Sequence, residues 1–573
     1  MSMNEEYDLI ICGGGLAGLT LARQLTLSDL GLSILVLEKA RRPLPEAAFK
    51  VGESTIETGA YYYGKVLQLE DYLETEHLEK LGLRYFSKGP DGNANIATRP
   101  EYGVERFLPA KSYQLDRGKM ENHLRDLVEA AGVNLKEGVE VTGIDLAQDG
   151  GPHVVTYEEG GEKRSATARW VVDALGRRRL IQKKLGLRKE SPGMFNSAWF
   201  RVRGKLRVGD LVPASETEWH GRVKEDRWNS TNHLMNNGYW VWLIPLAPDN
   251  TSVGIVASEE LHPFSGYSTY EKALAWLDEH EPLVGTAARD YPLLDFLKLK
   301  HYSYTSHKAF SADRWTCVGE AAAFADPYYS VGSNMIGFAN GFTQRMIELD
   351  REGRLTPEYV EYANRFFLTL NDALTDTIHR GYPYLGNAPV HACKTIWDYY
   401  IGWTTTDPQF YHQIYLDPKL ATIVSGLISP IVVTQGRMMR LLEDWGRHES
   451  SYTFGFIDYI KDLPTLCDLH VRMLPPKSDD FRRFMNTLRE AVERIEELAH
   501  VIFFMAVRDV LPEKADLFRE RPWINTGAIS LDPSRWEKDG LFEPKTKPRD
   551  LSHLSDEIGR LFTVKNVLAG AAR

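Results

Sequence analysis

A glycine-rich turn near the start of the chain has the residue types and spacing needed to hold a phosphate. A strand-like apolar segment precedes Gly13, Gly15 and Gly18, and a helical pattern follows them. These glycines permit a tight turn and let a pyrophosphate approach the N-terminus of the helix. A second apolar segment, 33–37, ends at Glu38, which is placed to accept a hydrogen bond from a ribose hydroxyl. The pattern predicts a dinucleotide site but does not distinguish NAD from FAD.

A second group of chemically informative residues is the sequence Trp-Val-Trp-Leu-Ile-Pro at 240–245. Side chains alternate between the two faces of a strand, so Trp240 and Trp242 must lie on the same side. Two indoles side by side would form an aromatic wall, and Ile244 and Pro245 complete the motif. A buried core strand ended by the proline would have the same composition, so this alternative stays open.

Two later apolar segments extend the pattern around the glycine turn. The segment 170–176 reads as a strand that ends at Asp173 and a turn, and 315–327 reads as a strand, an acidic turn and the start of a helix. With this spacing, the segments resemble the three-part FAD signature of the hydroxylase-type flavoproteins. Arg117, which precedes an amphipathic helix, resembles a further flavin contact of that family and is suited to a phosphate or the flavin edge.

The third segment departs from that signature at one position. The family usually carries Gly-Asp there, whereas this chain has Gly319-Glu320, followed by Pro327. Glu320 could still contact the ribityl chain of the flavin. Alternatively, it is an acidic residue favoured by the dipole at the start of a helix.

Four motifs between residue 9 and about 345 are together similar to those of the flavin-dependent halogenases, which are built on the flavin hydroxylase fold. They are the glycine turn, Gly52-Glu53-Ser54, the double-tryptophan motif, and Phe324, Pro327, Ser330 and Gly332 in the pattern F-x-x-P-x-x-S-x-G. The resemblance implies that FADH2, supplied by a separate flavin reductase, reacts with O2 and chloride or bromide to give hypohalous acid. The motif Gly52-Glu53-Ser54, after a strand-like segment 48–51, would strap the flavin, and the tryptophans would keep an organic substrate away from it.

The resemblance also implies an essential lysine, which we assign to Lys80 because an aromatic strand-like segment follows it closely. Lys88 is the second candidate, and Lys65 is less suitable because it lies in an apparent helix. A single lysine is most often a solvated surface charge. Burial would lower the pKa of this amine and make both its neutral and its protonated form accessible.

The segment 330–332 is predicted to bind the halide. Backbone N–H groups at a turn and at a helix N-terminus attract an anion without offering a nucleophile, and a helix is expected to begin near Asn334. By resemblance, the amides around Ser330, Val331 and Gly332 would hold the ion. The alternative is a helix cap made by a serine, with no ion bound.

Tyr329 bears on the substrate. By resemblance, tryptophan halogenases carry a glutamate at this position, so tryptophan is not expected as the substrate. The tyrosine pattern is similar to members that act on phenols, pyrroles or polyketide aromatics, either free or tethered to a carrier protein. Tyr329 is therefore a candidate catalytic residue, and a role as pocket wall is the alternative.

Composition excludes several classes of protein. The net charge of −11 and the isoelectric point near 5.9 argue against nucleic acid or an anionic membrane as partner. Four scattered cysteines suggest neither a disulfide framework nor a metal site. The N-terminus does not resemble a signal peptide, and no apolar run approaches membrane-spanning length, so we expect a cytoplasmic protein.

The predicted fold is α/β, with a Rossmann-like FAD-binding domain, an inserted substrate-side β-sheet and a mostly helical C-terminal region. The expected divisions are the first part of the FAD-binding domain at 1–184, the sheet at 185–310, the last part with the halide turn at 311–345, and the helical region at 346–573. Helical spacing of apolar residues is clearest at 481–502.

Two other functions remain open from the sequence. A flavin-dependent aromatic hydroxylase would share the fold but would need neither Lys80 nor a halide. A non-catalytic flavoprotein could use the helical C-terminal region to bind a partner or a carrier. The combination of lysine, halide turn and tryptophan wall favours the halogenase.

Overall fold

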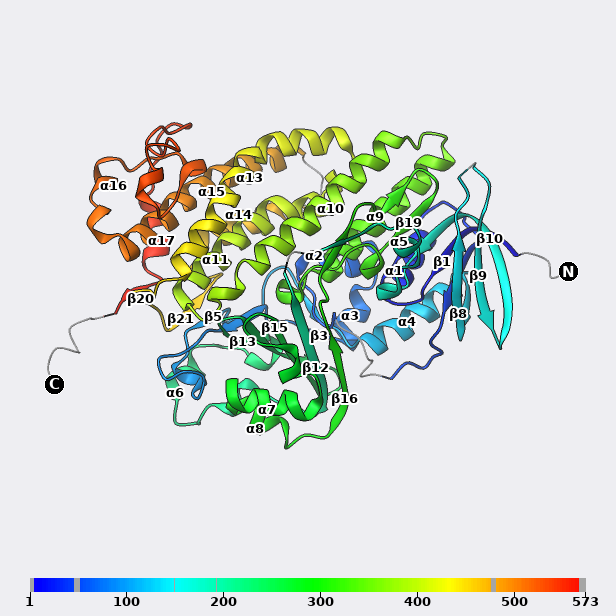
Figure 1. Cartoon of the computed structure of the whole chain (residues 1–573), viewed down its shortest axis with the longest axis horizontal. Helices are drawn as coiled ribbons and strands as arrows, with labels where there is room; N and C mark the ends of the chain where they lie inside the picture. The colour runs from blue at the N-terminus through cyan, green and yellow to red at the C-terminus, as the bar shows by residue number, and fades with distance from the viewer. Residues whose placement is uncertain (1–4, 46–51, 149, 192, 476–480, 566–573) are drawn as a thin grey trace.

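The computed structural model describes residues 5–45, 52–148, 150–191, 193–475 and 481–565. Figure 1 shows a first sheet near the N-terminus, a second sheet below it and a layer of long helices above. The predicted α/β class and the helical C-terminal region are confirmed. The strand-like segment expected at 48–51 lies outside the described residues.

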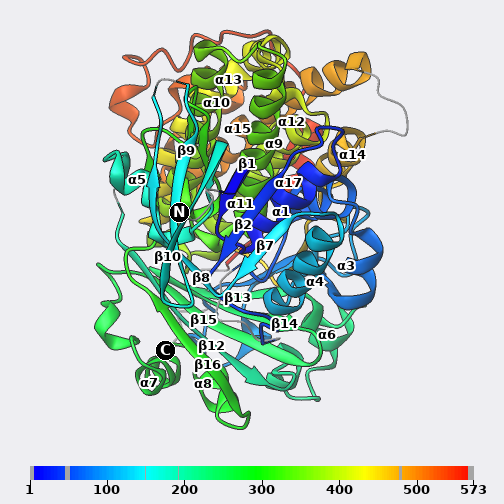
Figure 2. The same cartoon turned by 90° about the vertical axis from the view of Figure 1, so that its right-hand side faces the viewer.

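The nucleotide-binding sheet is built from apolar strands that are mostly parallel, as expected when helices cover a sheet. Its path runs β18 (Phe310–Ser311), β19 (Trp315–Cys317), β10 (Glu162–Asp173), β1 (Glu5–Cys12), β2 (Ile34–Glu38) and β7 (Asn134–Glu137). A hairpin of β8 (Val139–Asp145) and β9 (His153–Glu159) pairs with β10. The helices α1 (Leu16–Thr26), α4 (Arg117–Ala130) and α9 (Gly332–Arg351) lie against this part (Figure 2). The glycine turn joins β1 to α1 at the carboxyl edge of the sheet, where ligands bind in folds of this kind.

The second sheet carries the tryptophan motif. Its order is β16 (Leu293–Leu299), β12 (Phe195–Arg203), β15 (Asn250–Ser258), β14 (Tyr239–Leu246), β13 (Thr231–Asn236), β4 (Leu83–Phe86), β5 (Glu101–Gly103) and β21 (Phe456–Asp458). Residues of the helices α6 (Thr217–Gly221), α7 (Tyr270–His280) and α8 (Pro282–Ala288) share an apolar core with this sheet. Because β4, β5 and β21 come from elsewhere in the chain, the predicted boundaries 185–310 do not enclose this sheet.

The alternation of β14 places its two faces in different cores. Trp240, Trp242 and Ile244 pack with the helical region, whereas Tyr239, Val241 and Leu243 pack with α7 and α8. The two indole centroids are 5.6 Å apart. The prediction that both tryptophans lie on one side of the strand is therefore confirmed.

The C-terminal region packs on the tryptophan-bearing face of this sheet and supplies its edge strand β21. Its helices are α10 (Pro357–His379), α11 (Ala388–Ile401), α12 (Asp407–Tyr411), α13 (Pro418–Gly446), α14 (Pro464–Met473), α15 (Phe481–Val510), α16 (Leu517–Glu520) and α17 (Ser552–Gly559). The described part of the chain contains two π-helical turns, one at Tyr62–Val66 after α2 (Glu57–Tyr61) and one at Gly402–Thr406 before α12.

One helix contradicts an expectation from the sequence. Over an 18-residue window, α13 has a mean hydropathy of 1.3 and 22% of the window is buried. By length and composition alone it could cross a membrane, so the expectation that no apolar run approaches that length is wrong. Such a helix is weak support for a membrane span, because core helices pass the same test.

Candidate active site

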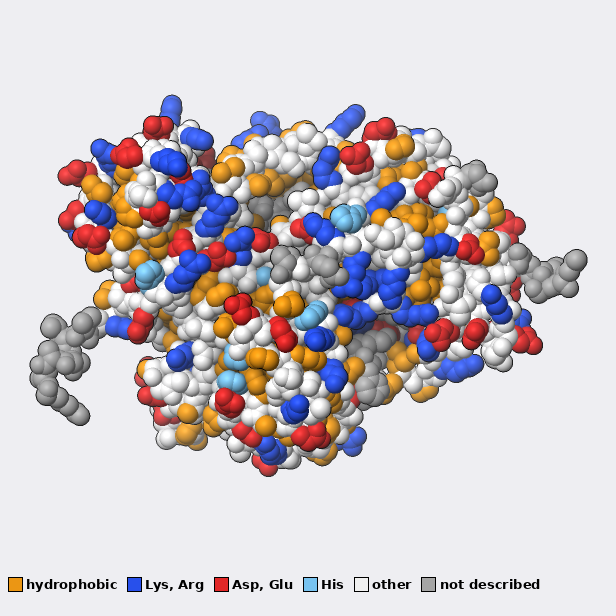
Figure 3. Space-filling view, in the orientation of Figure 1, with side chains coloured by type: hydrophobic (Ala, Val, Ile, Leu, Met, Phe, Trp, Pro, Cys, Tyr) orange, Lys and Arg blue, Asp and Glu red, His pale blue; other side chains and the backbone are white. Residues whose placement is uncertain are grey.

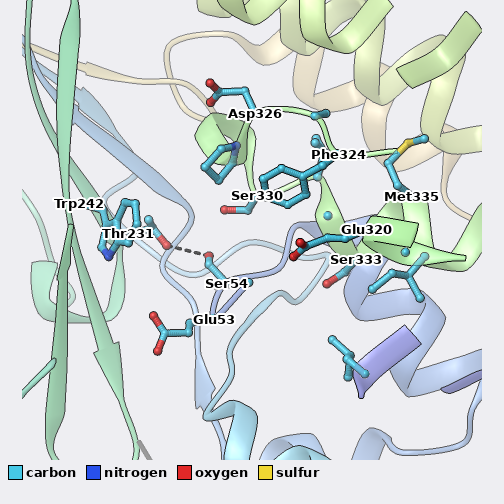
Figure 4. Close-up of a pocket in the computed structure, with 18 of the residues that line it drawn as sticks. Glu53, Ser54, Thr231, Trp242, Glu320, Phe324, Asp326, Ser330, Ser333 and Met335 are labelled. Atoms are coloured by element: carbon cyan, nitrogen blue, oxygen red, sulfur yellow. Dashed lines mark hydrogen bonds between the residues drawn. The ribbon is translucent and has the colours of Figure 1, made fainter. Parts of the chain in front are cut away.

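A central cavity of about 120 Å³ lies between the tryptophan-bearing sheet and the start of α9. Figure 4 shows Thr231 and Trp242 on one side of it, and Glu320, Ser333 and Met335 on the other. Most of the predicted site residues line it, although they come from four distant stretches of the chain. They are Gly52, Glu53, Ser54, Arg117, Trp240, Trp242, Ile244, Gly319, Glu320, Pro327, Ser330, Val331 and Gly332. Pro245 is not among the lining residues and lies in β14 opposite Thr251 of β15.

An outer cavity of about 400 Å³ lies at the glycine turn. Gly13, Gly15 and Glu38 line it, and it shares Arg117, Gly319 and Glu320 with the central cavity. Its other lining residues include the basic side chains Lys39, Arg177, Arg178 and Lys298. Figure 3 shows several Lys and Arg side chains gathered on this face near α5 (Leu180–Lys184). The two cavities thus adjoin each other, and basic side chains line the outer one.

The glycine turn has the tight backbone of a dinucleotide site, and a side chain at Gly13 or Gly18 would clash with backbone carbonyl groups. Gly13 has a φ of +109°, and a Cβ there would lie 2.4 Å from the carbonyl oxygen of Ala174. A Cβ at Gly18 would lie 2.0 Å from the carbonyl oxygen of Gly13. The N-cap of α1 is Gly15, which makes no side-chain capping bond, so the first amides of the helix can receive a phosphate.

Two acidic residues of the predicted cofactor site play different parts. Glu38 lines the outer cavity and accepts a hydrogen bond of 2.7 Å from the amide of Gly14. Asp173 is fully buried and lines neither cavity. Its carboxylate accepts hydrogen bonds from the amides of Leu175 and Ile181. Asp173 therefore shapes the turn after β10, whose residues Ala174 and Leu175 line the outer cavity.

The start of α9 has the geometry of an anion site. Ser330 adopts a left-handed conformation, with a φ of +58°, at the end of the short turn Pro327–Tyr329. Val331 is the N-cap of α9 and provides no side-chain capping bond, and the helix begins at Gly332. The first N–H groups of a helix have no partner within it and carry the positive end of its dipole. This N-terminus faces the central cavity.

Lys80 lies next to the central cavity. Its side chain is buried, and its Nζ donates hydrogen bonds of 2.9 Å to Ser54 Oγ and 2.7 Å to the carbonyl of Thr55. Burial lowers the pKa of the Lys80 amine from 10.5 to about 7, and the nearby Glu57 carboxylate opposes this change. In contrast, Lys88 is exposed, and Lys65 is exposed and paired with Glu70.

Ser54 joins the lysine to the cavity. It lines the central cavity, and its hydroxyl lies 2.8 Å from that of Thr231, as the dashed line in Figure 4 shows. The neighbouring Glu53 accepts a hydrogen bond from Arg201, a buried residue of β12. The segment that begins at Gly52 is thus fixed both to the second sheet and to Lys80.

The tryptophan wall is held by polar contacts that the sequence did not predict. The Trp240 indole N–H donates to the Tyr382 hydroxyl at 2.9 Å, and Tyr382 in turn donates to Asp326 at 2.8 Å. Trp242 lies flat over Gly254 on β15, where a Cβ would come within 2.2 Å of the ring. The wall is therefore rigid, and the C-terminal region helps to fix it.

Tyr329 is placed differently from the other predicted residues. Its side chain is buried, and its hydroxyl donates a hydrogen bond of 2.7 Å to Asp398 on α11. Lys394 forms an ion pair with the same carboxylate. Tyr329 is not among the lining residues of the central cavity, so it links the halide turn to α11.

Among the residues that line the central cavity, three polar ones, Thr231, His233 and Asp326, were not anticipated from the sequence. Thr231 and His233 are alternate residues of β13 that face the cavity, and burial lowers the pKa of His233 to about 3. Asp326 accepts hydrogen bonds from Tyr302 and Tyr382. The only available signals were the period of two in β13 and the acidic residue directly before Pro327.

Comparison with known proteins identifies the family. The family described as "FAD binding domain" matches residues 6–336, which is more than half of the chain. The flavin-dependent halogenase chlA of Dictyostelium discoideum is 25% identical over 79% of this chain and 78% of its own length. A 1H-pyrrole-2-carbonyl-[peptidyl-carrier protein] chlorinase of Pseudomonas fluorescens is 26% identical over 57% of this chain and 73% of its own length.

Solved structures agree with this assignment at the level of the fold. Halogenase PltM superimposes with a TM-score of 0.60 at 17% identity, covering 86% of this chain and 96% of its own. The flavin-dependent brominase Bmp2 superimposes with a TM-score of 0.52 at 20% identity, covering 74% and 99%. The chain therefore belongs to the FAD-binding domain family and, within it, to the flavin-dependent halogenases.

Proposed function

We propose that the protein halogenates an electron-rich aromatic substrate at Lys80, using hypohalous acid made in the central cavity. The observation that carries this proposal is the buried Lys80 amine, 2.9 Å from a serine hydroxyl that lines the cavity. A buried amine with a pKa near 7 is available at neutral pH in both its free and its protonated form. It can therefore accept a halogen or hydrogen-bond hypohalous acid.

Each part of the cavity has a distinct task in this proposal. The glycine turn and Glu38 hold the nucleotide end of FAD, and Arg117 lies where the two cavities meet. The amides that follow Ser330 hold chloride or bromide beside the flavin ring. FAD, when bound and reduced, supplies the electrons that activate O2 for oxidation of the halide.

The tryptophan wall separates the two ends of the reaction. Trp240 and Trp242 are buried and fixed by hydrogen bonds and by the close approach of Gly254. A substrate on the lysine side therefore cannot reach the flavin. Small hypohalous acid can pass along Ser54 and Thr231 to Lys80. Direct hydroxylation of the substrate is thereby suppressed.

The proposed substrate is a phenol, a pyrrole or a polyketide-like aromatic. Whether it is free or bound to a carrier protein is decided by the test below. Two relatives are named for pyrrole-2-carbonyl groups on a peptidyl carrier protein, and another is named tetracycline 7-halogenase. Because Tyr329 is bound to Asp398 away from the cavity, we assign it a positioning role. Tyr329→Phe should keep most of the turnover.

The test supplies FAD, a flavin reductase, NADH, O2 and bromide to the purified protein with free phenols and free or carrier-bound pyrroles. A brominated product, seen by its isotope doublet in mass spectrometry, is expected. Lys80→Ala should abolish it without changing FAD binding, and the matched variant of the exposed Lys88 should remain active. Hydroxylated product alone, or loss of activity only in Lys88→Ala, would contradict the proposal.

A further inference from the structure

Two buried carboxyl groups lie near Lys80 and have no part in the proposed reaction. Glu57 is the first residue of α2 and follows Thr55, whose carbonyl accepts a hydrogen bond from Lys80, by two positions. Asp407 is the first residue of α12. The exposed fractions of Glu57 and Asp407 are 6% and 5%, and that of Lys80 is 2%. All three groups are thus removed from water.

Packing of α2 against α12 brings the first turns of two helices, which carry Glu57 and Asp407, into one buried region across 350 residues of sequence. The Thr58 hydroxyl, next to Glu57 on α2, donates a hydrogen bond of 3.4 Å to the hydroxyl of Tyr411 on α12. Trp403, which lowers the pKa of Glu57, lies in the π-helical turn directly before α12. Single π-helical turns are frequent at functional sites.

The charges of this cluster do not balance if every group is ionised. Two carboxylates and one ammonium group would leave a net negative charge in an apolar interior, which is costly. Burial raises the pKa of Asp407 to about 7, and the negative charge of Glu57 raises it further. Burial also raises the pKa of Glu57, whereas Lys80 lowers it. One carboxyl group therefore holds a proton near neutral pH.

The other titratable groups that face the cluster stay neutral over this range. His233 on β13 has a pKa lowered to about 3 by burial. The phenols of Tyr85 on β4, Tyr411 on α12 and Tyr459 after β21 have pKa values raised by burial. Of the described groups that face the cluster, only the two carboxyl groups can change their charge near pH 7. The charge of Lys80 in this range thus depends on them.

On the basis of the proposed role of Lys80, we propose that Glu57 and Asp407 share one proton and thereby set the charge of Lys80. They are positioning residues, because they act through the lysine and not on the substrate. When Glu57 is ionised, its negative charge stabilises the ammonium form of Lys80. When the proton moves to Glu57, the free amine is favoured. Asp407 decides between these states because the two like charges disfavour each other.

The test compares two variants that should change Lys80 in opposite directions. Glu57→Gln removes the negative charge that supports the ammonium group, so the pKa of Lys80 should fall by about one unit. Asp407→Asn removes the competing carboxylate, so Glu57 ionises more readily and the pKa of Lys80 should rise. A merely structural role would not produce opposite changes.

The pKa of Lys80 can be measured in the protein without FAD or substrate. Competitive acylation with acetic anhydride, followed by mass spectrometry of the Lys80 peptide at each pH, reports the fraction of free amine. Glu70→Gln, at an exposed glutamate paired with Lys65, is the matched control and should leave the value unchanged. Thermal unfolding and FAD titration show that each variant is folded.

Opposite changes in the labelling experiment, with parallel changes in the pH profile of kcat, would support the proposal. Changes in the same direction, or none, would overturn it. If Glu57→Gln does not fold, Asp407→Asn remains decisive, because only an upward change fits. Absence of halogenation in every variant, with opposite labelling changes, would refute the proposed function but leave the proton-sharing pair intact.

Discussion

Replacement of Lys80 by methionine should abolish halogenation and also change how stability depends on pH. The pKa of this amine is lowered from 10.5 to about 7 in the folded protein. Between these values the unfolded chain binds a proton that the folded protein lacks, so the stability of the wild-type protein must rise with pH. Below pH 7 the burial penalty is fully present. Methionine has similar length and no charge, so it removes both the penalty and its pH dependence.

The size of the effect follows from the same two values. The difference between 10.5 and about 7 corresponds to about 5 kcal/mol at 1.36 kcal/mol per pH unit. Between pH 7 and pH 9.5, a practical range, the wild-type protein should gain about 3 kcal/mol relative to Lys80→Met. Loss of the hydrogen bonds to Ser54 and Thr55 destabilises the variant by about 1–3 kcal/mol for each group left unpaired, at every pH.

The assay is urea unfolding of both proteins without FAD at pH 7, 8 and 9.5, followed by tryptophan fluorescence. Lys88→Met, at an exposed lysine, is the control and should keep a constant difference from the wild-type protein. If the difference in the free energy of unfolding between Lys80→Met and the wild-type protein stays constant from pH 7 to pH 9.5, Lys80 is not mostly uncharged above pH 7, and the reasoning is refuted. That result would also remove the basis for proposing that Lys80 acts both as a free amine and as an ammonium group.

Three further changes test the rest of the site. Gly18→Ala should weaken FAD binding about tenfold or more, because its Cβ would lie 2.0 Å from the carbonyl of Gly13; fluorescence titration measures this, with Gly209→Ala, which has open space, as control. Trp242→Ala should lower the free energy of unfolding by about 3–5 kcal/mol. It should also yield hydroxylated product beside halogenated product in mass spectrometry; halogenation alone would argue against a barrier. Asp326→Asn should lower the free energy of unfolding by about 1–3 kcal/mol, because the hydroxyls of Tyr302 and Tyr382 lose their acceptor. An unchanged melting temperature would contradict this.

Local patterns sufficed for the parts of the site that are continuous in sequence. The glycine turn, the alternation at Trp240 and Trp242, and the helix start after Ser330 each depend on backbone rules that act over a few residues. For this reason their places in the structure could be anticipated. Lys80 was chosen by resemblance to a family segment, through its spacing to the residues that form β4, and its catalytic role stays a prediction.

The parts that could not be anticipated depend on packing between distant segments. Glu57 influences the charge of Asp407 only because α12 packs on α2, and no spacing in the sequence records that packing. The same holds for Tyr382, which reaches Trp240 from the end of α10. A buried carboxyl group has no sequence signature of its own, because its burial is decided by its neighbours in space.

The parallel pairing of β5 with β21 has a consequence for the engineering of this enzyme. The strand β21, Phe456–Asp458, comes from the last third of the chain, yet it completes the sheet whose inner strands carry the tryptophans. A chimera that joins residues 1–345 to the C-terminal region of another halogenase must therefore also restore this edge, or an open strand is left to aggregate. Transplants should exchange β5 and β21 together with the helices.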